Sequence, residues 1–242
     1  MKQKIEICMA VLFIAVSVLV SVWSVRTVTS KQIAAQTKVV IDAGHGGDDP
    51  GKVAADGTKE KDINLEIGLR LGEYLKEQGM SVHYTRQTDR GLYSEGESAT
   101  KAADLQKRCR IVENIQPDIT ISIHQNSYSD SSISGAQVFY YTTSEESKRL
   151  GEAIQEQLVR CVDPTNHRKA KANDSYYILK KTVSPTVIVE CGFLSNEKEC
   201  EKLQQSTYQK KLVEGIYQGI LQYRQAADSA DSTGASETNA ER

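Results

Sequence analysis

The sequence predicts a single α/β domain built on an open, mostly parallel sheet with helices on both faces. Short apolar runs rich in β-branched residues alternate along the chain with longer segments whose apolar residues recur every three or four positions. That alternation is typical of parallel sheets covered by helices on both sides. The length of 242 residues suits one large core better than two. We therefore expect one globular unit with additional segments at its ends.

The first strand and the first helix are the clearest elements. Lys38 to Ala43 is a β-branched run that stops at a glycine-rich turn, Gly44 to Gly47. Asp62 to Gln78 carries apolar residues at a spacing of four, and Gly79 is placed to end that helix. Similar patterns predict strands at Met80 to Thr85, Ile119 to Ile123, Ala136 to Tyr141, Tyr176 to Leu179 and Thr186 to Val189, and helices at Ala99 to Ile115, Glu145 to Val162 and Tyr208 to Arg224.

The N-terminal residues 1–26 are predicted to be a membrane anchor or a signal segment. The uncharged apolar stretch from Ile7 to Val25 follows two lysines and is long enough to span a bilayer. An uncleaved anchor is favoured because no A-x-A-like cleavage site follows the stretch; a buried core helix is the structural alternative. Residues 27–37 form a polar linker. We therefore expect the domain to lie outside the cytoplasmic membrane.

The domain itself is expected over residues 38–224. Residues 225–242 are rich in Ala, Ser, Asp, Thr and Glu without apolar periodicity, so they are predicted to be a disordered tail. Gly91 to Ala99 and Asn126 to Gly135 are polar loops beside strand ends, where substrates often bind.

Charge and cysteine content narrow the function further. A net charge of -2 and a pI near 6.1 show no excess of basic residues, so nucleic acid is not an expected partner.

Four cysteines lie outside the apolar stretch, an even number that allows up to two disulfides or four free thiols acting as small apolar residues. They are Cys109, Cys161, Cys191 and Cys200.

Polar residues that directly follow predicted strands are the candidate site residues. His45, His124 and Glu190 each come at the end of an apolar run, and ligands bind at the carboxyl ends of strands in open α/β sheets. Two imidazoles and one carboxylate form a ligand set that leaves the fourth zinc position to water. Glu60, at the start of the first long helix, supplies a second carboxylate for proton transfer. Spacing alone does not decide which glutamate has which role.

Each candidate also has a purely structural interpretation. The His45 loop fits a tight turn or a phosphate-binding loop that lacks its lysine. Glu60 fits a favourable charge in the first turn of a helix, and His124 a hydrogen-bonded histidine at a strand end. Glu190 is the strongest indication of function, because a carboxylate after three β-branched residues is costly unless it is paired or used.

Five motifs in order resemble those of zinc-dependent N-acetylmuramoyl-L-alanine amidases of the Amidase_3 type. The resemblance extends over roughly Lys38 to Arg224. The motifs are IDAGHGG (Ile41 to Gly47), KEKDINL (Lys59 to Leu65), TRQTDR (Thr85 to Arg90), SIHQN (Ser122 to Asn126) and VECGFLSN (Val189 to Asn196).

The resemblance implies a twisted six-stranded sheet between helices and assigns the roles that spacing leaves open. His45, Glu60 and His124 correspond to the zinc ligands, and Glu190 to the catalytic glutamate. Members of the family hydrolyse the amide bond between the lactyl group of N-acetylmuramic acid and L-alanine, so peptidoglycan is the expected substrate. Peptidoglycan lies outside the cytoplasmic membrane, in agreement with an exported domain.

Some details look like the germination-specific amidases of spore formers. These are the run Lys171 to Leu179, Cys191 after the glutamate, and a single N-terminal segment without wall-binding repeats. This subgroup acts in forming muramic δ-lactam in the spore cortex. Two departures from the family pattern, Gln125 and the long loop Tyr93 to Ala103, bear on substrate preference.

Two further interpretations stay open at this point. One is a catalytically inactive peptidoglycan-binding or regulatory module, and the other is a zinc peptidase that cuts within the stem peptide. The sequence also leaves open whether a partner protein is needed for zinc binding.

Overall fold

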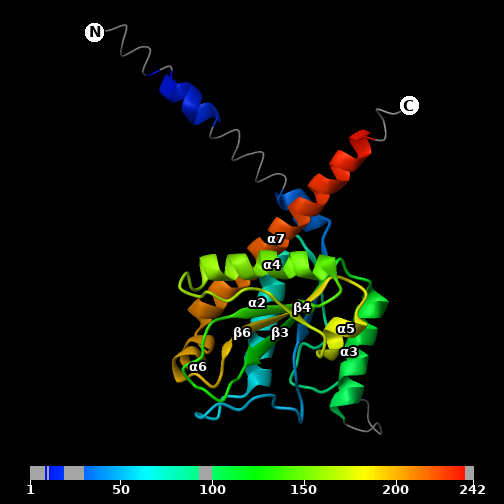
Figure 1. The fold of residues 1–242 in the computed structure, drawn as a ribbon, viewed down its shortest axis with the longest axis vertical. Coiled ribbons are helices and arrows are strands. Elements are labelled where there is room, and N and C mark those ends of the chain that lie inside the picture. Colours follow the sequence, from blue (N-terminus) through cyan, green and yellow to red (C-terminus); the bar gives the residue numbers. More distant parts are fainter. Residues whose placement is uncertain (1–8, 10, 19–29, 93–99, 238–242) are drawn as a thin grey trace.

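The structure is a computed structural model that describes residues 9, 11–18, 30–92 and 100–237, and a six-stranded sheet lies at its centre (Figure 1). The strands are β1 Lys38–Ala43, β2 Ser81–Tyr84, β3 Ile119–Asn126, β4 Gln137–Tyr141, β5 Lys171–Asn173 and β6 Thr186–Phe193, in the spatial order β2-β1-β3-β6-β4-β5. Strands β2, β1, β3 and β6 are mutually parallel, while β4 runs antiparallel to β6 and carries β5 parallel to itself. The predicted mostly parallel sheet is confirmed.

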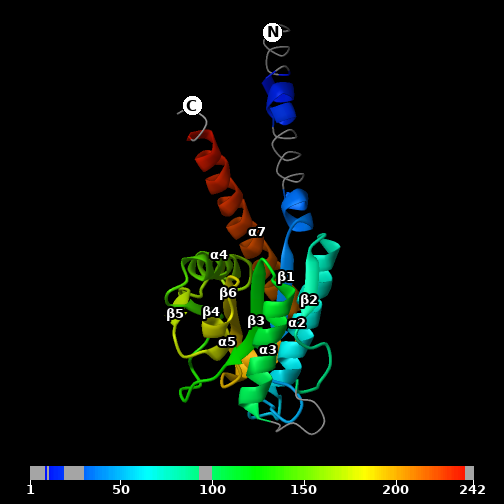
Figure 2. The same cartoon turned by 90° about the vertical axis from the view of Figure 1, so that its right-hand side faces the viewer.

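Helices cover both faces of this sheet (Figure 2). α2, α4 and α7 pack together on one face, and α3 and α5 cover the other, while α6 follows the end of β6. The helices are α2 Glu60–Glu77, α3 Lys101–Ile115, α4 Glu145–Cys161, α5 Tyr177–Lys181, α6 Glu197–Leu203 and α7 Ser206–Glu237. This arrangement explains why the central strands read as continuous apolar runs rather than as alternating ones.

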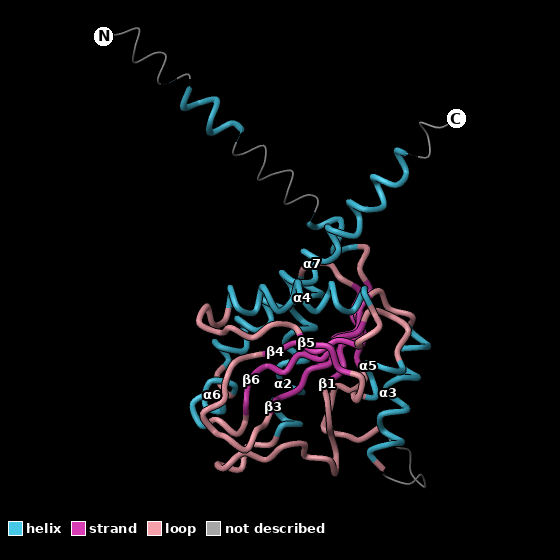
Figure 3. The backbone as a smooth tube through the Cα atoms, viewed as in Figure 1, coloured by secondary structure: helices cyan, strands magenta, loops and turns pink. Residues whose placement is uncertain are grey.

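The main core fills the face covered by α2, α4 and α7. Ile67 and Leu71 of α2 are fully buried against it, together with Val187 and Val189 of β6. Ile188 points to the opposite face and joins a smaller cluster with Phe139, Ile178 and Leu179, because successive side chains of a strand alternate between faces. The long loops gather at the end of the sheet opposite the projecting end of α7 (Figure 3).

The chain between β4 and β6 differs from the prediction. Tyr176 to Leu179 was expected to form a strand, but α5 begins at Tyr177, and the strand that pairs with β4 is Lys171–Asn173. A short apolar run does not distinguish a strand from one buried helical turn. Helix α6 was not expected; Asn196 caps it by accepting a hydrogen bond from the Glu199 amide at 3.0 Å.

Of the predictions for the two ends of the chain, those for the linker and for the tail differ from the structure. Most of the predicted anchor, residues 1–26, lies outside the described residues; among the described parts, no helix is both long and apolar enough to cross a membrane. The linker packs more closely than predicted, since Ile33 and Ala34 are buried. At the other end, α7 continues to Glu237 and projects beyond the domain (Figure 1), where a tail without regular structure was expected. Residues such as Ala226 and Ala227 favour continuing a helix that is already formed.

The four cysteines of the domain are free thiols in the structure. Cys191 and Cys200 are buried, and Cys109 and Cys161 are partly buried. No disulfide therefore forms among these four cysteines, and the buried Cys191 and Cys200 fit the alternative of small apolar residues.

Candidate metal centre

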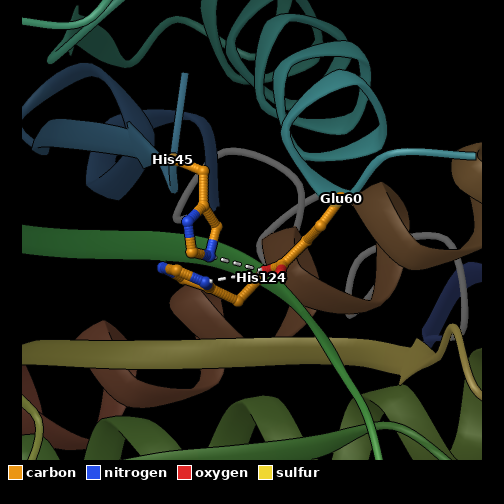
Figure 4. Close-up of side chains that lie close together, drawn as sticks. All are labelled: His45, Glu60 and His124. Atoms are coloured by element: carbon orange, nitrogen blue, oxygen red, sulfur yellow. Dashed lines mark hydrogen bonds and ion pairs between the residues drawn. The ribbon is translucent and has the colours of Figure 1, made fainter. Parts of the chain in front are cut away.

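Two histidines and one glutamate converge at the carboxyl end of the parallel strands (Figure 4). His45 follows β1, His124 lies in the neighbouring strand β3, and Glu60 is the first residue of α2. Nε2 of His45 lies 3.2 Å from Oε1 of Glu60, and Nδ1 of His124 lies 3.0 Å from the same oxygen. One nitrogen or oxygen atom from each residue falls within 4.8 Å of the others.

This donor set fits a zinc ion. Zinc is usually bound by imidazole nitrogens and carboxylate oxygens at roughly 2.0–2.2 Å, which places neighbouring ligand atoms of a tetrahedron roughly 3.3 Å apart. The two separations at Glu60, 3.2 and 3.0 Å, are close to that edge length. With three protein ligands a fourth position remains for water or substrate, as in catalytic zinc sites.

Glycine and a left-handed backbone allow the groups to approach so closely. A Cβ atom at Gly44 would stand 2.2 Å from the His124 ring, so only glycine fits there. At Gly51, where φ is +66°, a Cβ would lie 2.6 Å from Oε2 of Glu60. His45 itself has a φ of 62°, a conformation that L-residues other than glycine rarely adopt. The turn after β1 therefore presents its imidazole at some conformational cost.

Glu60 is held by hydrogen bonds to both carboxylate oxygens. Oε2 accepts from the Lys52 amide at 2.8 Å, and Oε1 accepts from the Gln125 amide at 3.1 Å and from the Asn64 side chain at 3.3 Å. Burial alone would raise the pKa of Glu60, but hydrogen bonds and charges from His124 and His45 outweigh burial and hold the pKa well below its usual range. Glu60 is therefore a carboxylate at neutral pH, as a metal ligand must be.

Asp49 orients His45 from the side away from Glu60. Its Oδ2 lies 2.8 Å from Nδ1 of His45, and its Oδ1 pairs with Lys101 at 2.9 Å. A carboxylate only accepts, so this contact places a proton on Nδ1 and leaves Nε2 facing Glu60. Burial lowers the pKa of His45, but hydrogen bonds and charges from Glu60 and Asp49 together raise it above its ordinary value.

Two buried guanidinium groups support the loop that carries His45. Arg108 of α3 donates to Oδ1 of Asp42 and to the Ala43 carbonyl, each at 2.7 Å, and to the His45 carbonyl at 2.6 Å. Arg86 donates to the carbonyls of Ala43 and Gly44 at 2.8 and 2.9 Å. Asp42 also accepts from Thr85 and Ser122.

These supporting residues were not identified from the sequence as part of the site. Signals for them exist: Arg86 lies within the motif TRQTDR, and Asp42 interrupts an apolar strand. Arg108 falls between Leu105 and Val112 on the inward side of its helix, a position where a charged residue is unusual unless paired.

Glu190 lies beside the three clustered residues but is not one of them. It is next to His124 in the parallel register of β3 and β6 and is only 6% exposed. Its Oε2 is buried and has no hydrogen-bond partner among the described residues, and its Oε1 lies 3.5 Å from the Tyr176 hydroxyl. Burial raises the pKa of Glu190 to about 7, aided by the charge of Glu60 and opposed by that of His124.

One hollow reaches the two histidines, and a second lies near Glu60. A cavity of about 320 Å³ contains His45 and His124 in its wall and is bounded by Lys101 and Arg108 of α3. A wider groove of about 1080 Å³ begins at Lys52, whose amide binds Glu60, and its lining includes Ser131, Ser132 and residues 194–198. The loop from Asn126 to Gly135, predicted to bind substrate, thus contributes to the larger groove; most of the other predicted loop, 91–99, lies outside the described residues.

Sequence comparisons show which known enzymes this chain is similar to. A family model described as N-acetylmuramoyl-L-alanine amidase matches residues 39–222. The germination-specific N-acetylmuramoyl-L-alanine amidase of Bacillus subtilis is 39% identical over 188 residues, which cover 76% of this chain and 78% of that protein. The N-acetylmuramoyl-L-alanine amidase LytC of the same organism is 34% identical over 187 residues, covering 76% of this chain and 35% of LytC.

Solved structures agree with the sequence comparisons. The CwlD amidase of Clostridioides difficile, determined in complex with the GerS lipoprotein, superposes with a TM-score of 0.76 at 43% identity. That match covers 79% of this chain and 100% of the other. The amidase Ami1 of Mycobacterium smegmatis, at 18% identity and a TM-score of 0.70, shares the fold.

Proposed function

Because this chain belongs to the N-acetylmuramoyl-L-alanine amidase family and is itself such an amidase, we propose that it works with a zinc ion held by His45, Glu60 and His124. The bond cleaved is the amide between N-acetylmuramic acid and L-alanine of peptidoglycan. The observation that carries the proposal is the convergence of three ligand atoms within 4.8 Å beside a buried, separate carboxyl group.

Glu190 is the proton-transfer group in this proposal. Zinc, when bound, supplies a Lewis acid that polarises the scissile carbonyl and acidifies water. Glu190 takes the proton of the attacking water and returns it to the alanine nitrogen as the amide bond breaks. A pKa of about 7 suits both steps, because near neutral pH the group is readily deprotonated and reprotonated.

The variant Glu190→Gln separates proton transfer from metal binding. We expect a loss of roughly 10²–10⁴-fold in hydrolysis, the usual contribution of such a group, with zinc content and melting temperature unchanged. Hydrolysis is measured as free amino termini released from purified peptidoglycan, and zinc by elemental mass spectrometry. His45→Ala should instead lose the metal. Glu113→Gln, an exposed carboxyl on α3, serves as the control; wild-type turnover of Glu190→Gln would end the assignment.

Metal dependence and the bond cleaved are tested together on the wild-type protein. Chelator should abolish hydrolysis and added zinc should restore it. Mass spectrometry of the products should show muropeptides that have lost the whole stem peptide. Products cut within the stem peptide would indicate a peptidase, and absence of any product from zinc-loaded protein would indicate an inactive binding module.

The location assigned to the enzyme is the outer side of the cytoplasmic membrane or the cell wall. The uncharged stretch Ile7 to Val25 supports residues 1–26 as the anchor or signal, followed by the linker 27–37 and the catalytic domain 38–224. Extraction of isolated membranes with alkaline carbonate tests this: an anchored protein stays in the membrane pellet, and a cleaved one is released.

The biological role assigned is maturation of the spore cortex, through the formation of muramic δ-lactam, and germination. The Bacillus subtilis relative is a germination-specific amidase, which supports a role in germination, and the Clostridioides difficile relative forms a complex with the GerS lipoprotein, which supports a partner lipoprotein. Cortex from spores without this protein should lack the lactam. Zinc affinity measured with and without a GerS-like lipoprotein tests for the partner.

A further inference from the structure

We propose that Tyr176 is a positioning residue for Glu190, with its hydroxyl donating a hydrogen bond to Oε1 and so fixing the direction of the carboxyl group. The inference rests on the proposed catalytic role of Glu190. Tyr176 immediately precedes α5, a segment that the sequence predicted as a strand without assigning it any role in the site. The Tyr176 hydroxyl lies 3.5 Å from Oε1 of Glu190.

Tyr176 is held firmly enough to act as a positioning group. Its amide donates to Oδ1 of Asn173 at 2.9 Å, and the same oxygen accepts from the Ser175 amide at 2.8 Å. Its ring packs edge-to-face against Phe139 of β4, with ring centroids 5.7 Å apart. Backbone and ring are thus both anchored, and the remaining freedom is that of the hydroxyl proton.

Glu190 in turn has few other groups to hold it. Glu190 is 6% exposed, and in the part of the chain that the structure describes its Oε2 has no hydrogen-bond partner. Within the described residues, the Tyr176 hydroxyl is the donor placed against Oε1. The separation of 3.5 Å is long for an O–H···O contact, as catalytic hydrogen bonds often are before substrate tightens the site.

Tyr176 remains a hydrogen-bond donor at neutral pH. Burial raises the pKa of Tyr176 to about 12, and the nearby charges of Glu190 and Glu60 act in the same direction. The hydroxyl therefore stays protonated beside Oε1 of Glu190, where it can fix the direction of the carboxyl group without titrating itself.

Tyr176→Phe tests the inference in the full-length, zinc-loaded protein. The variant keeps the ring and its packing on Phe139 and removes only the hydroxyl. We expect kcat to fall roughly ten- to hundredfold, as expected for loss of a hydrogen bond to a charged group, with KM within about twofold. Zinc content and melting temperature should not change. Tyr141→Phe, a tyrosine of the same apolar cluster, is the matched control and should keep wild-type kcat.

A double-mutant cycle with Glu190→Gln identifies the route of the effect. If Tyr176 acts through Glu190, adding Tyr176→Phe to Glu190→Gln should leave the residual hydrolysis within about twofold. Additive losses, a change in KM alone, or an unchanged kcat in the single variant would each overturn the inference. Failure of the proposed function looks different, because Glu190→Gln would then itself be fully active.

Discussion

Glu60 and Glu190 lie in the same site, yet their carboxyl groups have very different surroundings. Glu60 accepts hydrogen bonds from two backbone amides and from Asn64, and two imidazoles stand within 3.2 Å of it. Glu190 has one long contact and one oxygen without a partner. Both residues are buried, so the difference between their pKa values comes from the number of partners. The pKa of Glu60 lies well below its usual range, whereas that of Glu190 rises to about 7.

The difference separates two physical requirements. A group that binds a metal must be ionised and fixed before the metal arrives, and hydrogen bonds to the charged form achieve this. A group that exchanges protons must be able to exist both as the protonated acid and as the carboxylate. Burial with few partners brings the pKa of such a group close to neutral pH. The proposed metal ligands His45 and Glu60 therefore depend on a network of hydrogen bonds around them, whereas Glu190 has the single contact from the Tyr176 hydroxyl.

The largest expected effect is on folding stability and comes from replacing Arg108, which holds Asp42 and the loop that carries His45. Arg108→Met leaves Asp42 as an unpaired buried carboxylate and removes the donor to the His45 carbonyl. Breaking a buried pair in this way costs about 3–5 kcal/mol of folding free energy. Urea unfolding of the metal-free protein measures the change. Arg110→Met, exposed on the same helix, should cost less than about 0.5 kcal/mol. Equal stability of the two variants would show that the loop carrying His45 does not depend on the Arg108 network.

The sequence predicted which candidate residues lie close together better than it predicted their surroundings. His45, His124 and Glu190 each follow an apolar run, and a parallel sheet brings such positions to one edge, so local patterns suffice to find them. Motif resemblance was needed to choose between Glu60 and Glu190, because their difference arises from contacts made after folding. The pairing of Asp42 with Arg108 joins residues 66 positions apart, and no local periodicity encodes it.

Tyr176 was also missed by the sequence analysis, in this case because the secondary structure around it was predicted wrongly. Its neighbourhood reads as a strand because Tyr and Ile favour strands, whereas the chain forms a single helical turn there. Had residues 176–179 formed a strand, successive side chains would have pointed to opposite faces. The short helix instead leaves Tyr176 at its boundary, with its hydroxyl beside Glu190. A secondary-structure error of four residues thus concealed a candidate for the site.

Carboxyl titration of the metal-free protein gives the next largest effect. Asp42 should titrate near pH 2, since hydrogen bonds and the Arg108 charge outweigh the opposing effect of burial, and Glu190 near pH 7. A depressed carboxyl pKa stabilises the fold above the unfolded value of 3.8. Asp42 therefore contributes about 2 kcal/mol that is lost as pH falls from 3.8 through about 2. Carbon-13 NMR of the side-chain carboxyls measures both midpoints; coinciding values would remove the distinction between the two sides.

The smallest effect is expected at Asp49, which supports a ligand without touching the metal position. Asp49→Ala removes the acceptor from Nδ1 of His45, so the imidazole loses both its fixed tautomer and its fixed orientation. Loss of such a partner lowers metal affinity by about tenfold, equivalent to about 1.4 kcal/mol.

Competition with a zinc-binding dye measures the affinity of the Asp49 variants without reference to activity. Asp49→Asn keeps a neutral acceptor and should recover part of the loss, while Asp62→Ala, exposed on α2, should leave affinity unchanged. If Asp49→Ala binds zinc as tightly as the wild type, the left-handed backbone of His45 and the Arg108 hydrogen bond to its carbonyl suffice to position the ring. The ligand side would then be organised from its main chain rather than through its side-chain partners.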